Sequence, residues 1–197
     1  LKEQAVEVLY QEETSELILP DSYPDADAVA DCGAVGCIRD REIRAGSMTA
    51  SGDFQACVLV TAADGTLCPL QSFLPFTARL NAPEIEAESS GTAELRIRGV
   101  DARLLNSRKV LLRVSYAVRL TVYGSGTITL RDAAETDGLQ LRHETVYGQF
   151  PAACTAREVE LSEPVDIPAA GAAVRRVLRS TPEIQITDRR LESGSLI

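Results

Sequence analysis

The chain has 197 residues, no Trp and only nine other aromatic residues (four Phe, five Tyr), and it carries a formal net charge of -9 at pH 7. This length is enough to bury an aliphatic core. The acidic balance argues against a nucleic-acid surface, which needs clustered Lys and Arg, and against an anionic membrane surface. No apolar run is long enough to span a membrane and the start, LKEQAVEV, does not resemble a signal peptide. These two observations predict a soluble, non-secreted protein, and the missing initiator Met predicts that the chain is part of a longer one.

The N-terminal part predicts strand followed by helix. Residues 2–19 alternate irregularly between polar and apolar side chains, which indicates one or two strands interrupted by an acidic turn at residues 11–15. The next segment has a helix-start signature, with Ser22 as a cap, Pro24 in the first turn and acids where the helix dipole favours negative charge. Two glycines then end the pattern. We therefore predict one short helix near residues 23–31.

A hairpin follows. Residues 48–62 place apolar side chains at alternate positions, which is the period of a half-buried strand. Asp64-Gly65 predicts a tight turn, and residues 68–80 return with the same alternation. The return strand contains Pro69 and Pro75, which cannot donate to a ladder. We therefore expect it to lie at a sheet edge or to carry a bulge.

The clearest strand signal covers residues 108–123. Every even position from Val110 to Val122 is apolar, and polar residues fall between them. A strand of this length would be unusually long, so we expect it to bend or to be divided between two sheets. Upstream, the alternation changes phase across Gly99, which indicates a bulge. These segments together predict an all-β fold, an antiparallel β-sandwich with long curled strands.

The chain also shows an internal similarity at an offset of 148 residues. Without a gap, Leu19-Pro20 falls on Ile167-Pro168, Asp40-Arg41 on Asp188-Arg189, and Gly46-Ser47 on Gly194-Ser195. Such self-similarity is typical of tandem repeats. We therefore predict a complete β domain over residues 1–149 and the opening segment of a second, truncated repeat over residues 150–197.

Four segments carry a resemblance to a known family. They are LPDSYPDADAV, IRDREIRAGSMTASGDFQACVLV, SFLPFTARL and VDARLLNSRKVLLRVSYAVRLTVY. Their order and spacing resemble the SPOCS domain family of endospore-forming bacteria. The family's pattern falls on Pro20 with Pro24-Asp25, on Gly46 to Gly52, on Leu74-Pro75-Phe76, and on Asn106 to Val110. The resemblance covers about residues 1–150 and restarts at the second copy.

The resemblance implies a structural role. Family members are spore coat or envelope assembly proteins, often with several such domains ahead of a LysM peptidoglycan-binding module. It therefore implies a non-enzymatic scaffold domain that binds protein partners in the mother-cell cytoplasm at the surface of the developing spore. The alternatives are a cell-wall or carbohydrate-binding β-sandwich, for which the absence of Trp is unfavourable, and a hydrolase with a carboxylate pair, for which no acids are marked out by spacing.

Two charged groups at equivalent positions of the repeats have opposite sign. We predict that they form partner-binding surfaces that favour contact between unlike repeats, within one chain or between chains. The alternative is that both are solvated helix faces. The acidic group lies in the first copy and the basic group in the second: Asp21, Asp25, Asp27 and Asp31, and Arg175, Arg176 and Arg179.

No other pattern indicates a reaction, a cofactor or a metal. Asp25, Asp27 and Asp31 have a spacing that would suit a hard cation, but they lack the glycine and the terminal Glu of an EF-hand, and a capped acidic helix accounts for them. His143 is the only histidine and lies in a weak strand, where a solvent-facing role is expected. The five cysteines have no C-x-x-C spacing, which favours reduced thiols.

Overall fold

The computed structural model describes residues 2–127 continuously and, beyond them, only residues 145, 160, 162–164, 174, 176–181, 187–188, 190–192 and 195–196. The chain divides into two compact units, Leu1–Glu163 and Pro164–Ile197. The predicted boundary between residues 149 and 150 lies outside the described residues. His143, Arg175 and Cys154 also lie outside them, so the expectations for these residues stay predictions.

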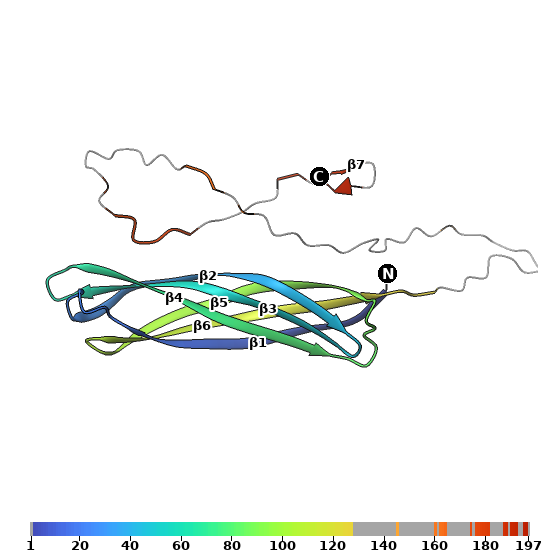
Figure 1. Cartoon of the computed structure of the whole chain (residues 1–197), viewed down its shortest axis with the longest axis horizontal. Helices are drawn as coiled ribbons and strands as arrows, with labels where there is room; N and C mark the ends of the chain where they lie inside the picture. The colour runs from blue at the N-terminus through green and yellow to red at the C-terminus, as the bar shows by residue number, and fades with distance from the viewer. Residues whose placement is uncertain are drawn as a thin grey trace, which may run out of the picture. The chain divides into compact units, whose positions relative to one another are not determined.

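Six long strands and no helix make up residues 2–127. Figure 1 shows these strands lying lengthwise alongside one another. They form two antiparallel three-stranded sheets, ordered β1-β6-β5 and β2-β3-β4. The strands are β1 (Lys2–Ile18), β2 (Ala26–Arg44), β3 (Ser47–Ala62), β4 (Leu67–Asn81), β5 (Ser90–Asn106) and β6 (Lys109–Gly124). The all-β, antiparallel prediction is confirmed.

β6 is the centre of the first sheet and matches the strongest sequence signal. All of its even-numbered residues from Val110 to Val122 are at most 1% exposed. The strand is not divided between two sheets, because β1 and β5 pair with it along its whole length. The predicted bulge is confirmed, since the register between β5 and β6 shifts between Ile97 and Gly99. β1 is continuous, so the predicted interruption at residues 11–15 is wrong.

β3 and β4 form the predicted hairpin. Gly65 has a φ of +82°, a conformation that glycine adopts without strain, and the backbone N–H of Thr66 donates to Asp64 Oδ1 at 2.9 Å. Hydrogen bonds from Thr66 lower the pKa of Asp64. β4 is an edge strand, as Pro69 and Pro75 predict, because a proline can occupy an edge without breaking a central ladder.

The predicted helix near residues 23–31 is wrong. The cap signals serve a turn instead, in which the backbone N–H of Tyr23 donates to Pro20 O at 2.9 Å. β2 begins at Ala26 and pairs with β3 from there to Arg44. A helix of two turns is only marginally stable, whereas pairing with a central strand supplies partners for the backbone over the whole segment. The nonlocal pairing therefore overrides the local signal.

The two sheets share one hydrophobic core, the arrangement expected of a sandwich. Its centre is an aromatic cluster in which the ring of Phe54 on β3 lies 4.9 Å from that of Phe76 on β4 and 4.7 Å from that of Tyr116 on β6. Each of these side chains is at most 3% exposed. Gly52 makes room for this cluster, since a Cβ there would lie 2.8 Å from the Phe76 ring. Aliphatic residues of both sheets extend the core on either side.

In the second unit the structure describes one short hairpin. β7 (Leu191–Glu192) pairs antiparallel with β8 (Ser195–Leu196). Leu191 is opposite Leu196, and Glu192 is opposite Ser195.

Candidate functional site

The predicted acidic surface lies partly on a turn that is fixed by an arginine. The guanidinium of Arg108 donates to the carbonyl oxygens of Leu19, Pro20 and Tyr23 at 2.7–3.0 Å. Its Nη1 also lies 3.3 Å from Asp25 Oδ1, and its Nη2 lies 3.7 Å from Asp21 Oδ1. These two acids therefore flank a structural arginine, which reduces the negative charge that they offer to a partner.

The other predicted residues that the structure describes lie on β2 and in the second unit. Asp27 and Asp31 are exposed on β2 rather than on a helix, and β2 shifts its register with β3 on both sides of Ala28–Val29. Arg176 and Arg179 are exposed in the second unit, which the structure describes by itself. The proposed contact between the acidic and the basic group therefore stays a prediction.

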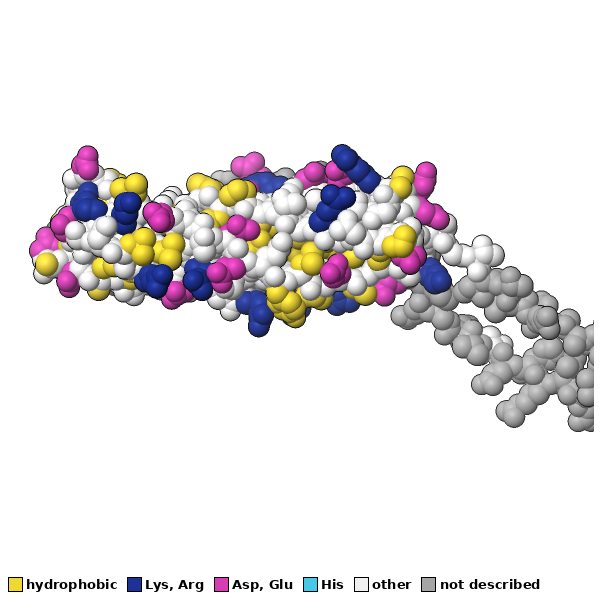
Figure 2. All heavy atoms as spheres, turned by 90° about the horizontal axis from the view of Figure 1, so that it is seen from below, with side chains coloured by type: hydrophobic (Ala, Val, Ile, Leu, Met, Phe, Trp, Pro, Cys, Tyr) yellow, Lys and Arg dark blue, Asp and Glu magenta, His cyan; other side chains and the backbone are white. Residues whose placement is uncertain are grey.

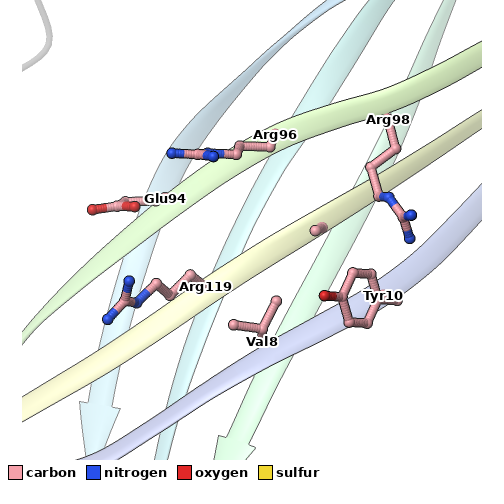
Figure 3. A pocket seen from close by; sticks show the side chains of 7 residues that line it. Val8, Tyr10, Glu94, Arg96, Arg98 and Arg119 are labelled. Carbon is pink, nitrogen blue, oxygen red and sulfur yellow. The ribbon is translucent and has the colours of Figure 1, made fainter.

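A second candidate binding surface lies on the outer face of the β1-β6-β5 sheet. It is a hollow of about 330 Å³, which we call the arginine basin, lined by Val8, Tyr10, Glu94, Arg96, Arg98, Ala117 and Arg119. Figure 3 shows how three strands contribute: Val8 and Tyr10 lie on β1, Arg119 on β6, and Glu94, Arg96 and Arg98 on β5.

Strand register explains why these side chains meet. Ala117 on β6 is opposite Tyr10 on β1 and opposite Arg96 on β5, so the three form one row across the sheet. Arg119 is opposite Val8 and Glu94 in the next row. Residues two apart on a strand point to the same face, which places both rows on the solvent side. The small side chain of Ala117 leaves the centre of its row empty and thereby makes the hollow.

The bulge at Gly99 adds the third arginine. Because the register shifts between Ile97 and Gly99, Arg98 is an extra residue in β5, and bulges of this kind redirect a side chain. The Arg98 guanidinium carbon lies 4.9 Å from the centre of the Tyr10 ring, within range of a cation–π interaction. Figure 3 shows the guanidinium of Arg98 beside that ring.

The charges of the basin are unbalanced, whereas those beside it are paired. On the same outer face, Arg113 Nε lies 3.4 Å from Glu12 Oε1, and Lys109 Nζ lies 3.9 Å from Glu16 Oε2. Among the residues that the structure describes, neither Arg96 nor Arg119 makes an ion pair. Figure 2 shows a face of the molecule on which charges of both signs alternate with hydrophobic side chains. Against this background, three arginines beside a single acid form a local excess of positive charge in an acidic chain.

The basin also offers apolar contact. Tyr10 is 67% exposed and Val8 is 43% exposed. Exposed tyrosine, arginine and aliphatic side chains around a hollow are the composition that protein interfaces favour, because tyrosine and arginine supply much of the binding energy. The arrangement can hold an anionic group between guanidinium groups and an apolar group against β1.

Sequence reasoning missed the basin. The alternation Glu94-Leu95-Arg96-Ile97-Arg98 marks solvent-facing arginines on a strand, and the phase change at Gly99 is visible beside it. The sequence does not show, however, that β1 and β5 both pair with β6. Only this pairing brings Tyr10 next to the arginines.

Two further findings concern metal binding and membrane spans. In the described part of the chain, no group of three or more His, Cys, Asp or Glu side chains is placed to hold a metal ion. The described residues also contain no helix long and apolar enough to cross a membrane.

Fold and surface together define a class: an antiparallel all-β protein with two sheets around one core and an exposed tyrosine–arginine surface on one sheet. Comparison with protein-family models, with curated proteins and with solved structures finds no match for this chain.

Proposed function

We propose that this chain is a non-enzymatic protein–protein interaction domain of the SPOCS type that acts as a scaffold in spore coat or envelope assembly. The two sheets around one core are then a β-sandwich that carries binding surfaces on its outer faces. The proposal also places the protein in the mother-cell cytoplasm at the surface of the developing spore. The observation that carries the interaction role is the arginine basin, because it combines exposed tyrosine and aliphatic side chains with three arginines beside a single acid.

The roles of the motif residues support the family assignment. Two motif segments, Pro20 to Asp25 and Asn106 to Val110, meet through Arg108, whose guanidinium binds the first segment while its backbone N–H donates to Asn106 Oδ1 at 2.9 Å. A third segment contributes Phe76 to the aromatic cluster. The recurring residues therefore hold the fold together. This is what is expected of a domain family whose members share a scaffold and differ in their partners.

We further propose that residues 150–197 open a second copy of the domain. At the offset of 148, Leu191 and Leu196 correspond to Ile43 and Met48, and Glu192 and Ser195 correspond to Arg44 and Ser47. In the first copy Ile43 is opposite Met48, and Arg44 is opposite Ser47. The β7–β8 hairpin repeats these two pairings residue for residue. The offset of 148 residues found in the sequence thus relates the register of the β7–β8 hairpin to that of the β2–β3 hairpin, and this agreement supports the repeat.

Contact between unlike repeats remains part of the proposal. Exchanging Arg175, Arg176 and Arg179 for Glu reverses the charge of the second copy's opening and weakens any self-association at low salt. Light scattering measures the particle mass. An unchanged mass at low salt argues against a contact made by these arginines.

Capture from sporulating cells tests the scaffold role. The full-length protein, tagged and expressed in its own host, is crosslinked during sporulation, purified and analysed by mass spectrometry. The proposal predicts enrichment of identified coat or envelope proteins, relative to a vegetative culture that expresses the same protein. Enrichment of metabolic enzymes or of no protein would contradict it.

Sedimentation with purified peptidoglycan tests the carbohydrate-binding alternative. Sugar rings stack on exposed aromatic faces, and Tyr10 supplies the one aromatic ring among the residues that line the basin. We therefore expect the protein to stay in the supernatant. Cosedimentation that is lost in Tyr10→Ala would favour the cell-wall module.

A further inference from the structure

We propose that the arginine basin binds an acidic, extended segment of a partner protein, with a carboxylate held between Arg96 and Arg119 and an apolar side chain two residues away against Val8 and Tyr10. This inference rests on the proposed function, because it names the chemistry of the partner. It follows from the charge, the spacing and the apolar border of the basin.

The positive charge of the basin favours an anionic ligand. Arg96 and Arg119 are exposed, and no carboxylate pairs with them among the described residues, although acids outnumber bases in the chain by 29 to 20. Arg113 on the same strand as Arg119 has its own partner, Glu12. Two guanidinium groups without a partner are donors for a ligand oxygen, and a carboxylate accepts from arginine in the bidentate geometry that makes these hydrogen bonds strong.

The spacing suits one carboxylate. Ala117, two residues from Arg119 on β6, is opposite Arg96 on β5. The two arginines are therefore diagonal neighbours, whose Cα atoms are about 7–8 Å apart in an antiparallel pair. Long side chains at this separation can converge on one group above Ala117. Figure 3 shows their guanidinium groups on the same side of the sheet.

The border of the basin favours a peptide over a polyphosphate. Glu94 also lines the basin, so its excess of positive charge is small and suits a single carboxylate better than a dense row of phosphates. Val8 and Tyr10 offer apolar area that a phosphate chain does not use. An extended peptide in which an acidic and an aliphatic residue lie two apart presents both on the same face, and it can therefore satisfy the arginines and the apolar border together.

Contacts between the edges of the two sheets favour binding of the partner on the outer face of the β1-β6-β5 sheet. Gln11 Nε2 on β1 donates to Thr77 O on β4 at 3.2 Å, so one pair of edges is linked across the two sheets. At the other pair, Arg41 Nη1 on β2 donates to Gly91 O on β5 at 3.4 Å. These contacts obstruct the addition of a strand from a partner at these places. The outer face of the β1-β6-β5 sheet remains open to a ligand.

Fluorescence anisotropy with a labelled peptide that repeats the sequence Glu-Ser-Val-Ser, which places Glu and Val on the same face of an extended chain, tests the inference on the full chain. We expect saturable binding that weakens as salt is raised, and a Kd at least about tenfold higher for the peptide with Gln in place of Glu. Arg96→Gln and Arg119→Gln should each raise the Kd about tenfold. Arg113→Gln is the matched control, because it removes an arginine of the same face that already has a partner. It should change the Kd by less than about twofold.

Three outcomes would overturn the inference. These are the absence of saturable binding, equal affinity for the Glu and Gln peptides, and a loss in Arg113→Gln as large as in Arg119→Gln. Circular dichroism of each variant establishes that the fold is retained. Failure of the peptide experiment with successful capture of coat proteins would refute the basin as the docking site while the scaffold role stands. Peptide binding without such capture would refute the scaffold role instead.

Discussion

Replacement of Phe76 by Ala tests the layered arrangement of the fold. Phe76 is 3% exposed, and its ring lies 4.9 Å from that of Phe54 and 5.2 Å from that of Tyr116. Truncating a buried Phe removes apolar contact and leaves a cavity, which costs about 3–5 kcal/mol. Because a domain is stable by only about 5–15 kcal/mol, Phe76→Ala should lower the urea midpoint by about 1–3 M, as followed by far-UV circular dichroism.

Phe73 provides a matched control on the same strand. It lies three residues before Phe76 on β4, points to the opposite face and is 66% exposed. Phe73→Ala should therefore change the free energy of unfolding by no more than about 0.5 kcal/mol. A loss in Phe73→Ala as large as in Phe76→Ala would mean that β4 does not present these two faces as described, and the reasoning on the core would fail.

Two further substitutions test the turn and the buried hydroxyl. Arg108→Met removes the donor for three carbonyl oxygens of the β1–β2 turn and should lower the free energy of unfolding in urea by about 2 kcal/mol. Arg103→Met, on the exposed face of β5, is the control and should change it little. Equal losses would show that Arg108 has no structural role. Burial, followed by the hydrogen bond to Glu13 and its charge, raises the pKa of Tyr116 above its ordinary value of 10.0. As the pH rises, the unfolded state therefore loses this proton first, so the stability that the hydroxyl contributes is fully present below about pH 10 and falls above it. In thermal melts at alkaline pH, Tyr116→Phe should make the decline of stability with pH less steep. An unchanged slope would contradict the assignment.

Much of the fold could be predicted because its strands carry local signals. The alternation from Val110 to Val122 fixed both the strand and its buried face, since a period of two can expose only every other side chain. Asp64-Gly65 marked the hairpin because few other pairs tolerate that turn. The phase change at Gly99 marked the bulge. Each of these features depends on residues that are adjacent in sequence.

The errors arise where a local signal has a nonlocal use. Ser22 and Pro24 are consistent with the start of a helix, but they lie in the connection between β1 and β2, which Arg108 binds from the turn between β5 and β6. The acidic run at residues 11–15 looks like a turn, yet Glu12 and Glu13 find cross-strand partners on β6. The composition of one segment cannot show a partner that lies about a hundred residues away.

The candidate site could not be predicted from the sequence for the same reason. Tyr10, Arg96 and Arg119 are ordinary solvent-facing residues when each strand is considered alone. Their significance depends on the order β1-β6-β5, which places β1 and β5 on either side of β6. The sequence also does not show that Asp21 and Asp25, two members of the predicted acidic surface, lie beside Arg108.

Localisation of a fluorescent fusion tests the central claim most directly. The full-length protein and its Arg96→Gln, Arg119→Gln double variant are imaged in the host bacterium through sporulation. A scaffold of the spore surface that docks through the basin should appear as a ring around the forespore, and the double variant should be diffuse in the mother cell at equal abundance. A wild-type protein that stays diffuse throughout sporulation would contradict the account.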